Sequence, residues 1–208
     1  MTTLLNLQNG TDIRGIALEN EDGLPVTLSQ SSTQAIAVGF INWITNRLPS
    51  DRSPIKIAIG TDSRLTASQL KEWLTEVFLS YGINVVDVGL ATTPAMFMST
   101  VFPSYHADAS IMITASHLPY FHNGFKFFTK DGGLGKKDIT YILSHSNHTS
   151  YPKGTGYLSN RNLIADYSAH LIQKIREETD SLFPLDGFHI IVDAGNGAGG
   201  FFVEQILN

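Results

Sequence analysis

Hydrophobic residues along the chain fall into two alternating patterns. Between Ser32 and Leu48, and again between Ser68 and Tyr81, they recur at the three- and four-residue spacing of an amphipathic helix. Shorter apolar runs with the length of strands lie at residues 55–60, 84–89, 109–114 and 124–128. The alternation of strand and helix predicts an α/β domain with a mixed, largely parallel sheet flanked by helices.

A second, shorter set of elements follows a polar stretch from Ser144 to Gly156, where we place the domain boundary. The first domain then covers residues 1–155, and residues 156–208 begin the second. Within the second, the pattern predicts a helix at 162–179, a strand at 188–192 and another helix from about Gly200. One strand and two helices cannot close an α/β layer, so we expect the truncated start of a second α/β domain.

Composition narrows the classes of partner. The formal net charge is −5, and a mildly acidic chain has no long-range attraction to nucleic acid or to an anionic membrane. No apolar run approaches the roughly 20 residues that span a bilayer, and no signal peptide is recognisable. Without cysteine, thiolate nucleophiles, disulfides and zinc–thiolate sites are excluded. We therefore expect a cytoplasmic protein with no nucleic-acid or membrane partner.

The segment TASHLPYFHNGFKFF, residues 114–128, carries the most chemistry. Ser116 follows an apolar strand, and open α/β sheets place their sites at that end of a strand. His117 lies beside it, and a turn at Asn123-Gly124 would bring Lys126 back toward the serine. A hydroxyl, an imidazole and an ammonium in one loop suit nucleophilic catalysis or phosphoryl transfer. The alternative is a serine that only caps a turn and a solvated lysine.

This segment resembles the signature of the α-D-phosphohexomutases, in which a serine loop TASHNP or TGSHNP is followed by NGxK. Three further segments resemble family motifs in the expected order: TDIRG with Arg14, GTDSR with Arg64, and DAGNGAGG from Asp193 to Gly200. The chain is therefore similar to the N-terminal domain and the start of the second domain of that superfamily. Leu118 stands where the family usually has Asn, and we expect the loss of that amide to affect the loop geometry.

The resemblance implies a phosphoglucomutase- or phosphomannomutase-type enzyme. Such an enzyme is an intramolecular phosphotransferase that interconverts hexose 1-phosphate and hexose 6-phosphate through a phosphoserine and a bisphosphate. Ser116 would carry the phosphate, with Lys126 as general acid or base. His117 would belong to the same catalytic loop, either contacting the phosphate or orienting the loop. Binding of substrate and phosphate groups is implied for three residues: Arg14, Arg64 and Asn123.

The resemblance also implies Mg²⁺ and a hexose 1,6-bisphosphate activator. The family holds Mg²⁺ with the seryl phosphate and three Asp of a DGDGDR-type loop, which this sequence lacks. Ser116, through its phosphate, would then be the metal ligand among these residues. We expect the N-terminal part of an enzyme of hexose phosphates, inactive by itself, and the sequence leaves the sugar and the oligomeric state open.

Two other classes of function compete with this interpretation. The first is a non-catalytic remnant of the fold that binds an anion or a partner. The second is a nucleotide-binding domain in which DAGNGAGG cradles a phosphate. That segment matches neither a Walker loop nor a dinucleotide fingerprint, and its glycines permit a tight strand-to-helix turn. We therefore favour a structural role for it.

Overall fold

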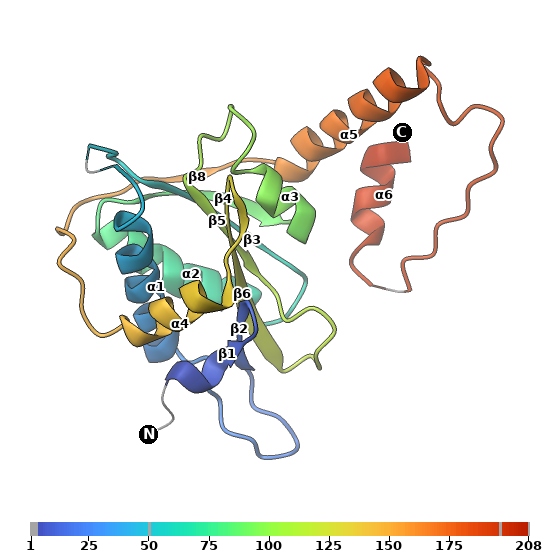
Figure 1. Ribbon diagram of the computed structural model, residues 1–208. Helices are drawn as coiled ribbons and strands as arrows, with labels where there is room; N and C mark the ends of the chain where they lie inside the picture. The colour runs from blue at the N-terminus through green and yellow to red at the C-terminus, as the bar shows by residue number, and fades with distance from the viewer. Residues whose placement is uncertain (1–3, 50, 196, 208) are drawn as a thin grey trace. The chain divides into compact units, whose positions relative to one another are not determined.

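The computed structural model describes residues 4–49, 51–195 and 197–207. Its contacts divide the chain into two compact units, one up to Arg161 and one from Asn162 onward. The first unit is a sheet with helices on its faces (Figure 1). In chain order its elements are η1 (Leu4–Leu7), β1 (Gln8–Asn9), β2 (Asp12–Ile16), α1 (Gln30–Thr45), β3 (Lys56–Thr61), α2 (Ala67–Ser80), β4 (Asn84–Leu90), α3 (Thr93–Met98), β5 (Ala109–Ile113), β6 (His122–Thr129), β7 (Gly132–Gly133), α4 (Lys136–Ser144) and β8 (Leu158–Asn160).

A mixed sheet forms the centre of the first unit, with strand order β1-β2-β6-β5-β3-β4-β8 and with β7 paired to β6. β3 pairs in parallel with β4 and with β5, and β4 pairs in parallel with β8. β6 is antiparallel to both β5 and β2. The α/β class and the mixed sheet predicted from the sequence are confirmed, and the antiparallel pairings gather on the side of β6.

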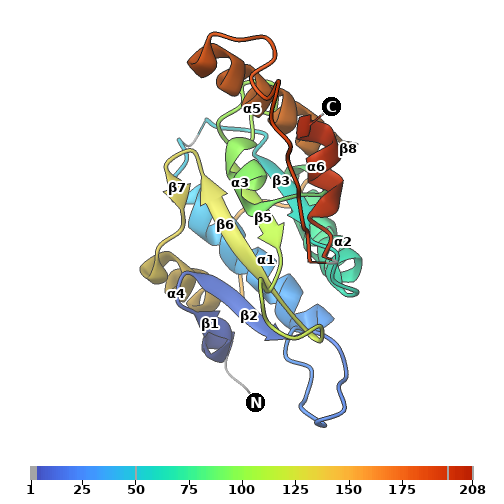
Figure 2. The same ribbon diagram turned by 90° about the vertical axis from the view of Figure 1, so that its right-hand side faces the viewer.

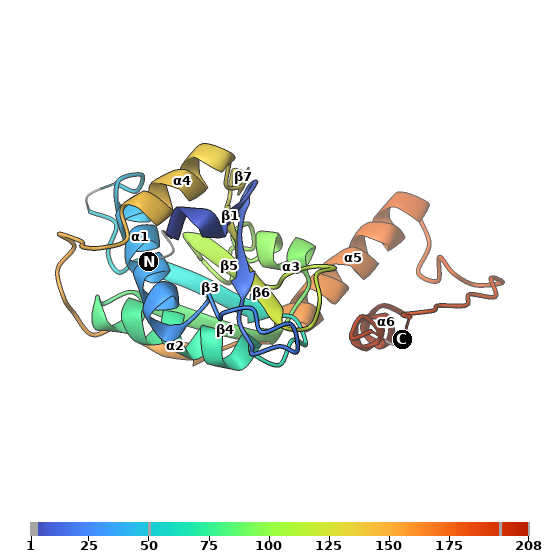
Figure 3. The ribbon, with the colours of Figure 1, turned by 90° about the horizontal axis from the view of Figure 1, so that it is seen from below.

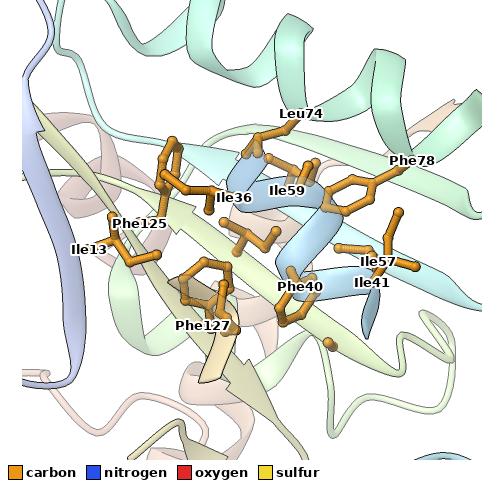
Figure 4. Packing of buried hydrophobic residues seen from close by; sticks show 14 of the residues in the cluster. Ile13, Ile36, Phe40, Ile41, Ile57, Ile59, Leu74, Phe78, Phe125 and Phe127 are labelled. Carbon is orange, nitrogen blue, oxygen red and sulfur yellow. The ribbon is translucent and has the colours of Figure 1, made fainter. Parts of the chain in front are cut away.

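Helices cover both faces of this sheet: α1, α2 and α4 lie on one face and α3 on the other (Figure 3). The main apolar core lies between α1 and the sheet (Figure 4). There the ring of Phe40 stacks on that of Phe127 with centroids 4.9 Å apart, and the ring of Phe78 meets Phe40 edge-on at 6.1 Å. All three rings are buried, so this aromatic cluster supplies much of the apolar area that holds the helix layer on the sheet.

The two helices expected from hydrophobic periodicity are present as α1 and α2. α1 begins where the hydroxyl of Ser29 accepts the backbone N–H of Ser32 at 3.3 Å, a side-chain cap for an otherwise unpaired donor. α2 ends at Ser80, and Gly82 follows with a φ of +71°, a conformation that glycine adopts without strain.

Helix α4 was not predicted from the sequence. It is a nine-residue helix, and a stripe that short gives a weak periodic signal between polar neighbours. Its first turn is fixed by Asp138, whose carboxylate accepts the backbone N–H of Gly135 at 2.9 Å. Three apolar residues of α4 are buried in the core beside α1: Ile139, Ile142 and Leu143.

The end of the first unit lies close to the predicted domain boundary. β8 starts after that boundary, at Leu158, and pairs with β4 at Val85–Asp87. The contacts divide the chain after Arg161, because β8 belongs to the sheet of the first unit. The assignment of residues 1–155 and 156–208 to two evolutionary domains stays a prediction.

The second unit contains α5 (Leu163–Thr179) and α6 (Gly200–Leu207), and both predicted helices are confirmed. The rings of Tyr167 and Phe202 stack with centroids 5.7 Å apart and join the two helices. The strand predicted at residues 188–192 is wrong, since these residues pair with no strand. A strand needs a neighbour for its N–H and C=O groups, and the described part of this unit contains none. Phe188 and Ile191 are accordingly 73% and 84% exposed.

The glycine-rich segment from Asp193 begins with a local turn. The carboxylate of Asp193 accepts the backbone N–H of Gly195 at 2.7 Å, and Gly195 has a φ of +59°. A side chain that bonds two residues ahead, followed by glycine in the left-handed region, is a turn-forming arrangement, which agrees with a structural role. Asn196 of this turn and Asn208, in the last predicted helix, lie outside the described residues.

Candidate active site

Ser116 lies on an exposed loop between β5 and β6, which we call the serine loop (residues 114–121). Figure 2 shows it in yellow-green at the lower end of these two strands. All five residues of β5 are buried, and the strand ends where Ile113 pairs with Thr61 of the parallel strand β3. The loop therefore leaves the C-terminal edge of the parallel strands, the edge at which open α/β sheets bind ligands.

The backbone of Ser116 adopts the left-handed region, with a φ of +57°. This conformation costs an L-residue about 1–2 kcal/mol, so contacts around the loop must hold it. Ser116 and the neighbouring His117 are both exposed. The hydroxyl is thus displayed to solvent on a backbone that is held in an uncommon conformation.

Residues 62–66, which connect β3 to α2, hold the start of the serine loop. The carboxylate of Asp62 accepts hydrogen bonds from the hydroxyl of Thr114 at 2.5 Å and from Nε of Arg64 at 3.2 Å. The hydroxyl oxygen of Thr114 in turn accepts a hydrogen bond from the backbone N–H of Ser116 at 3.0 Å. The GTDSR and TAS segments, 52 residues apart, therefore meet through Asp62 and Thr114.

Arg64 also donates to the carbonyl groups of the serine loop. Its Nη2 lies 2.8 Å from the oxygen of Ser116 and 2.7 Å from that of Leu118. Its Nη1 lies 2.8 Å from the oxygen of Pro119 and 3.0 Å from that of His122, the first residue of β6. These acceptors are backbone atoms, so the loop has anchors that do not depend on an Asn side chain at position 118.

The turn predicted at Asn123-Gly124 is wrong, because both residues lie within β6 and the chain reverses earlier, in residues 116–121. Asn123 is fully buried; its Nδ2 donates to the hydroxyl oxygen of Thr66 at 3.0 Å, and its Oδ1 accepts the N–H of Gly124 at 2.9 Å. A fully buried amide offers no surface to a substrate. The structure thus gives Asn123 a contact with the segment that connects β3 to α2, and its predicted phosphate contact stays a prediction.

Gly124 is needed for close approach between strands rather than for a turn. A Cβ at this position would overlap the carbonyl oxygen of Ile13 in β2 and would come within 3.1 Å of that of Thr114. Neither obstacle is a flexible side chain, so the backbone itself would have to move.

We expect Gly124→Ala to lower the free energy of unfolding by ~1–3 kcal/mol, because extra atoms in a packed region force the backbone apart. Gly133→Ala is the matched control: its Cβ would meet Phe128 at 3.6 Å, an ordinary contact. Thermal unfolding of both variants measures the difference, at about 2–4 °C in Tm per kcal/mol for a domain of this size. Equal Tm values for the two variants would contradict the close-approach argument.

Two cations share one carboxylate on the neighbouring strands β2 and β6. Nζ of Lys126 lies 2.5 Å from Oδ2 of Asp12, and Nη2 of Arg14 lies 2.8 Å from the same oxygen. Asp12 and Arg14 are two residues apart in β2, so their side chains extend from the same face of the sheet. The three side chains are between 10% and 23% exposed. Two cations against one carboxylate leave a net positive charge, which favours an anionic ligand.

The structure therefore sorts the predicted site residues into two groups. Ser116, His117 and Arg64 belong to the serine loop and its anchor, whereas Arg14 and Lys126 form the cation pair on the sheet. β6 links the groups, since it begins at the end of the serine loop and pairs Lys126 with Met112 of β5. The hydrogen-bond partner of Lys126 Nζ is Asp12 and not the serine hydroxyl.

Three residues that were not predicted from the sequence organise these groups: Asp12, Asp62 and Thr66. A signal for the first two was present, because TDIRG and GTDSR each place an Asp two residues before the Arg. In both segments the Asp and the Arg form an ion pair. The distance between the carboxylate oxygen and the guanidinium nitrogen is 2.8 Å for Asp12 with Arg14 and 3.2 Å for Asp62 with Arg64.

His122, the first residue of β6, directly follows the serine loop, and its buried Nδ1 has no hydrogen-bond partner among the described residues. Burial lowers the pKa of His122 below its usual value of 6.5, and the neighbouring Arg64 guanidinium lowers it further. The neutral imidazole is thus the form that the folded loop accommodates.

Acid is expected to destabilise the first unit through His122. Because the pKa is lower in the folded state, the unfolded chain binds more protons as the pH falls through 6.5, and stability falls with it. Urea unfolding at pH 7.5 and 5.5, for the natural chain and for His122→Phe, measures this contribution. The variant should lose less stability between the two pH values, and equal losses would show that His122 is not responsible.

Two further properties of the described residues bear on function. They contain no group of three or more His, Asp or Glu side chains that could hold a metal ion. Within the same residues, no helix combines the length and apolar character needed to cross a membrane.

Comparison with known proteins identifies the family of this chain. Residues 6–151 match the family model described as phosphoglucomutase/phosphomannomutase, alpha/beta/alpha domain I. The phosphoglucosamine mutase of Pediococcus pentosaceus is 34% identical over 207 residues, which cover 95% of this chain and 42% of that protein. The phosphoglucomutase of Neisseria meningitidis serogroup B is 29% identical over 76% of this chain and 33% of that protein.

A solved structure shares the fold. The phosphoglucomutase/phosphomannomutase family protein of Burkholderia thailandensis superposes with a TM-score of 0.71 at 20% identity, over 95% of this chain and 40% of that one. The chain thus spans about two fifths of the length of the Pediococcus pentosaceus and Burkholderia thailandensis proteins, and a third of that of the Neisseria meningitidis protein. Because the family model matches more than half of its residues, the chain belongs to the phosphoglucomutase/phosphomannomutase family and carries its alpha/beta/alpha domain I.

Proposed function

We propose that this chain is the serine-bearing part of a phosphohexomutase that interconverts hexose 1-phosphate and hexose 6-phosphate in the cytoplasm. The observation that carries the proposal is Ser116, an exposed hydroxyl on a left-handed backbone at the C-terminal edge of the parallel strands. Backbone strain that is held in place at an exposed nucleophile is typical of functional sites. Family membership supports phosphoryl transfer as the reaction class.

In the proposed reaction, a phosphate carried on Oγ of Ser116 moves to the free hydroxyl of a hexose monophosphate. A bond between phosphorus and the sugar oxygen forms, and the hydroxyl proton passes to a base. The bond between phosphorus and Oγ breaks, its electron pair stays on Oγ, and Oγ takes up a proton. The resulting hexose 1,6-bisphosphate then returns its other phosphate to Ser116, which restores the phosphoserine. The same bisphosphate acts as the activator, because it can phosphorylate a free Ser116.

We assign proton transfer at the sugar hydroxyl to Lys126 and contact with phosphate to Arg14. Arg14 and Lys126 both form ion pairs with the carboxylate of Asp12, so an incoming phosphate would compete with that single carboxylate for the two cations. Arg14 uses Nε and Nη2 for that carboxylate, and Nη1 has no partner among the described residues. His117, exposed beside Ser116, is placed to contact the phosphate that the serine carries.

Mg²⁺ would neutralise the charge of about −1.5 to −2 that phosphorylation brings to Ser116. The described residues do not form a metal site by themselves. From this chain, the ligand would be a phosphate oxygen on Ser116, and the other ligands would have to come from elsewhere. We therefore propose that the chain alone does not turn over hexose phosphates.

A fusion protein tests the proposed function. It joins this chain to the part of the Pediococcus pentosaceus phosphoglucosamine mutase that lies beyond the matched residues, and the intact relative serves as positive control. We expect turnover of at least one of four substrates, the 1-phosphates of glucose, mannose, glucosamine and N-acetylglucosamine, with Mg²⁺ and the matching bisphosphate. The chain alone should show none. A fusion protein that unfolds cooperatively and is inactive on all four would favour the non-catalytic remnant.

A further inference from the structure

Resting on the proposed function, we infer that Arg64 is a positioning residue that holds Ser116 and its loop in the reactive conformation, rather than a residue that contacts phosphate. A guanidinium has five N–H donors in a fixed planar arrangement. All of them are used within the chain: Nε by Asp62, Nη1 by Pro119 and His122, and Nη2 by Ser116 and Leu118. None is left for a substrate oxygen.

The four carbonyl acceptors explain what Arg64 fixes. They belong to residues on both sides of the chain reversal, from Ser116 in the loop to His122 at the start of β6. A single planar group therefore ties together the two sides of the serine loop. The contact at the carbonyl of Ser116 holds the peptide bond that follows the strained residue, and so it restrains ψ of Ser116 directly.

Asp62 fixes the direction from which Arg64 reaches the loop. Its Oδ1 accepts the backbone N–H of Arg64 at 3.0 Å, and its Oδ2 accepts both Nε of Arg64 and the hydroxyl of Thr114. Because Thr114 accepts the N–H of Ser116, the peptides on both sides of Ser116 are held by the same pair, Asp62 and Arg64. The Arg64 side chain is only 11% exposed, so this ion pair is screened little by solvent.

Turning Arg64 toward a substrate phosphate would break four hydrogen bonds from a charged donor at once. Lysine cannot replace it, because an ammonium is a point charge that cannot span carbonyls from residue 116 to residue 122. Arg14 provides the contrast, since only Nε and Nη2 of that guanidinium are bonded within the described residues.

Hydrogen exchange on the chain tests this inference without requiring activity. Arg64→Lys should speed exchange of the amides of Leu118 and His122, which bond to Ala115 and Pro119 within the loop, by about tenfold or more. Exchange in β3 should stay unchanged. Arg52→Lys is the matched control, because Arg52 pairs with Asp108 at 2.7 Å at the opposite end of β5. Unchanged loop exchange in a folded Arg64→Lys chain would overturn the inference.

If Arg64→Lys does not fold, Asp62→Asn gives the second measurement, since it weakens the orientation of Arg64 while keeping the side-chain size. A selective rise in loop exchange supports the inference, and no rise overturns it.

Kinetics of the fusion protein separate positioning from binding. Positioning predicts that Arg64→Lys lowers kcat with little change in KM, whereas a phosphate contact predicts a raised KM with kcat retained, which would refute the inference. Inactivity of the fusion protein with Arg64 in place would count against the proposed function alone, because the exchange measurement does not depend on turnover.

Discussion

Removal of the Ser116 hydroxyl is expected to lower kcat of the fusion protein by about 10⁴-fold or more, because loss of a nucleophile removes the covalent route. Within the serine loop, the other hydroxyls are that of Thr114, which is buried, and the exposed phenol of Tyr120. The measurement is turnover of the best hexose 1-phosphate by the natural and substituted fusion proteins.

The left-handed backbone at Ser116 decides which variant is informative. Alanine at a φ of +57° keeps the strain, whereas glycine removes both the hydroxyl and the strain. Ser116→Gly and Ser116→Ala should therefore be equally inactive if the hydroxyl itself reacts. Ser104→Ala, on another exposed stretch, is the control and should keep normal turnover.

Peptide mapping locates the phosphate independently of turnover. After incubation of the fusion protein with a hexose 1,6-bisphosphate, mass spectrometry should find phosphate on the peptide that contains Ser116. Phosphate found only on other peptides would end the assignment of Ser116 as the acceptor.

Lys126→Arg is expected to lower kcat by about 10²–10⁴-fold, the usual contribution of a general acid or base. Arginine keeps the positive charge beside Asp12, but a guanidinium titrates far above neutral pH and cannot exchange a proton during turnover. The loss should therefore appear in kcat and should not be rescued by higher substrate concentration.

A lysine with almost the same local geometry provides the control. Nζ of Lys71, in α2, lies 2.5 Å from Oδ2 of Asp87, and the Lys71 side chain is 22% exposed, against 23% for Lys126. Lys71→Arg should leave kcat unchanged, which separates the general effect of replacing a paired lysine from the chemistry. Near-normal kcat with a raised KM in Lys126→Arg would instead indicate that Lys126 only binds the substrate.

Short-range features of the sequence were enough to predict most of the first unit. Helices α1 and α2 follow from apolar residues at helical spacing, and β3 and β5 follow from short apolar runs, because burial on one or both faces fixes these patterns locally. The position of Ser116 at the end of a buried strand follows from the same patterns. The small strands β1, β2, β7 and β8 and the short helix α4 were missed, since each is held by neighbours rather than by a pattern of its own.

The tertiary structure alone decided the contacts of the predicted site residues. Nothing in the local sequence distinguishes Arg64, whose donors bond to the serine loop and Asp62, from Arg14, whose Nη1 has no partner in the part of the chain that the structure describes. Asn123-Gly124 is a common turn dipeptide, yet here it lies within β6. Asn123 donates to the hydroxyl of Thr66, 57 residues away, and Gly124, without a Cβ, lets the backbone of Ile13 in β2 approach closely. Lys126 and Asp12 are 114 residues apart and meet only through pairing of their strands. The sequence by itself thus determined the main helices and strands of the first unit and the location of Ser116, because hydrophobic burial produces a local periodic pattern. Hydrogen-bond partners depend on which strands lie side by side, and only the folded sheet settles that.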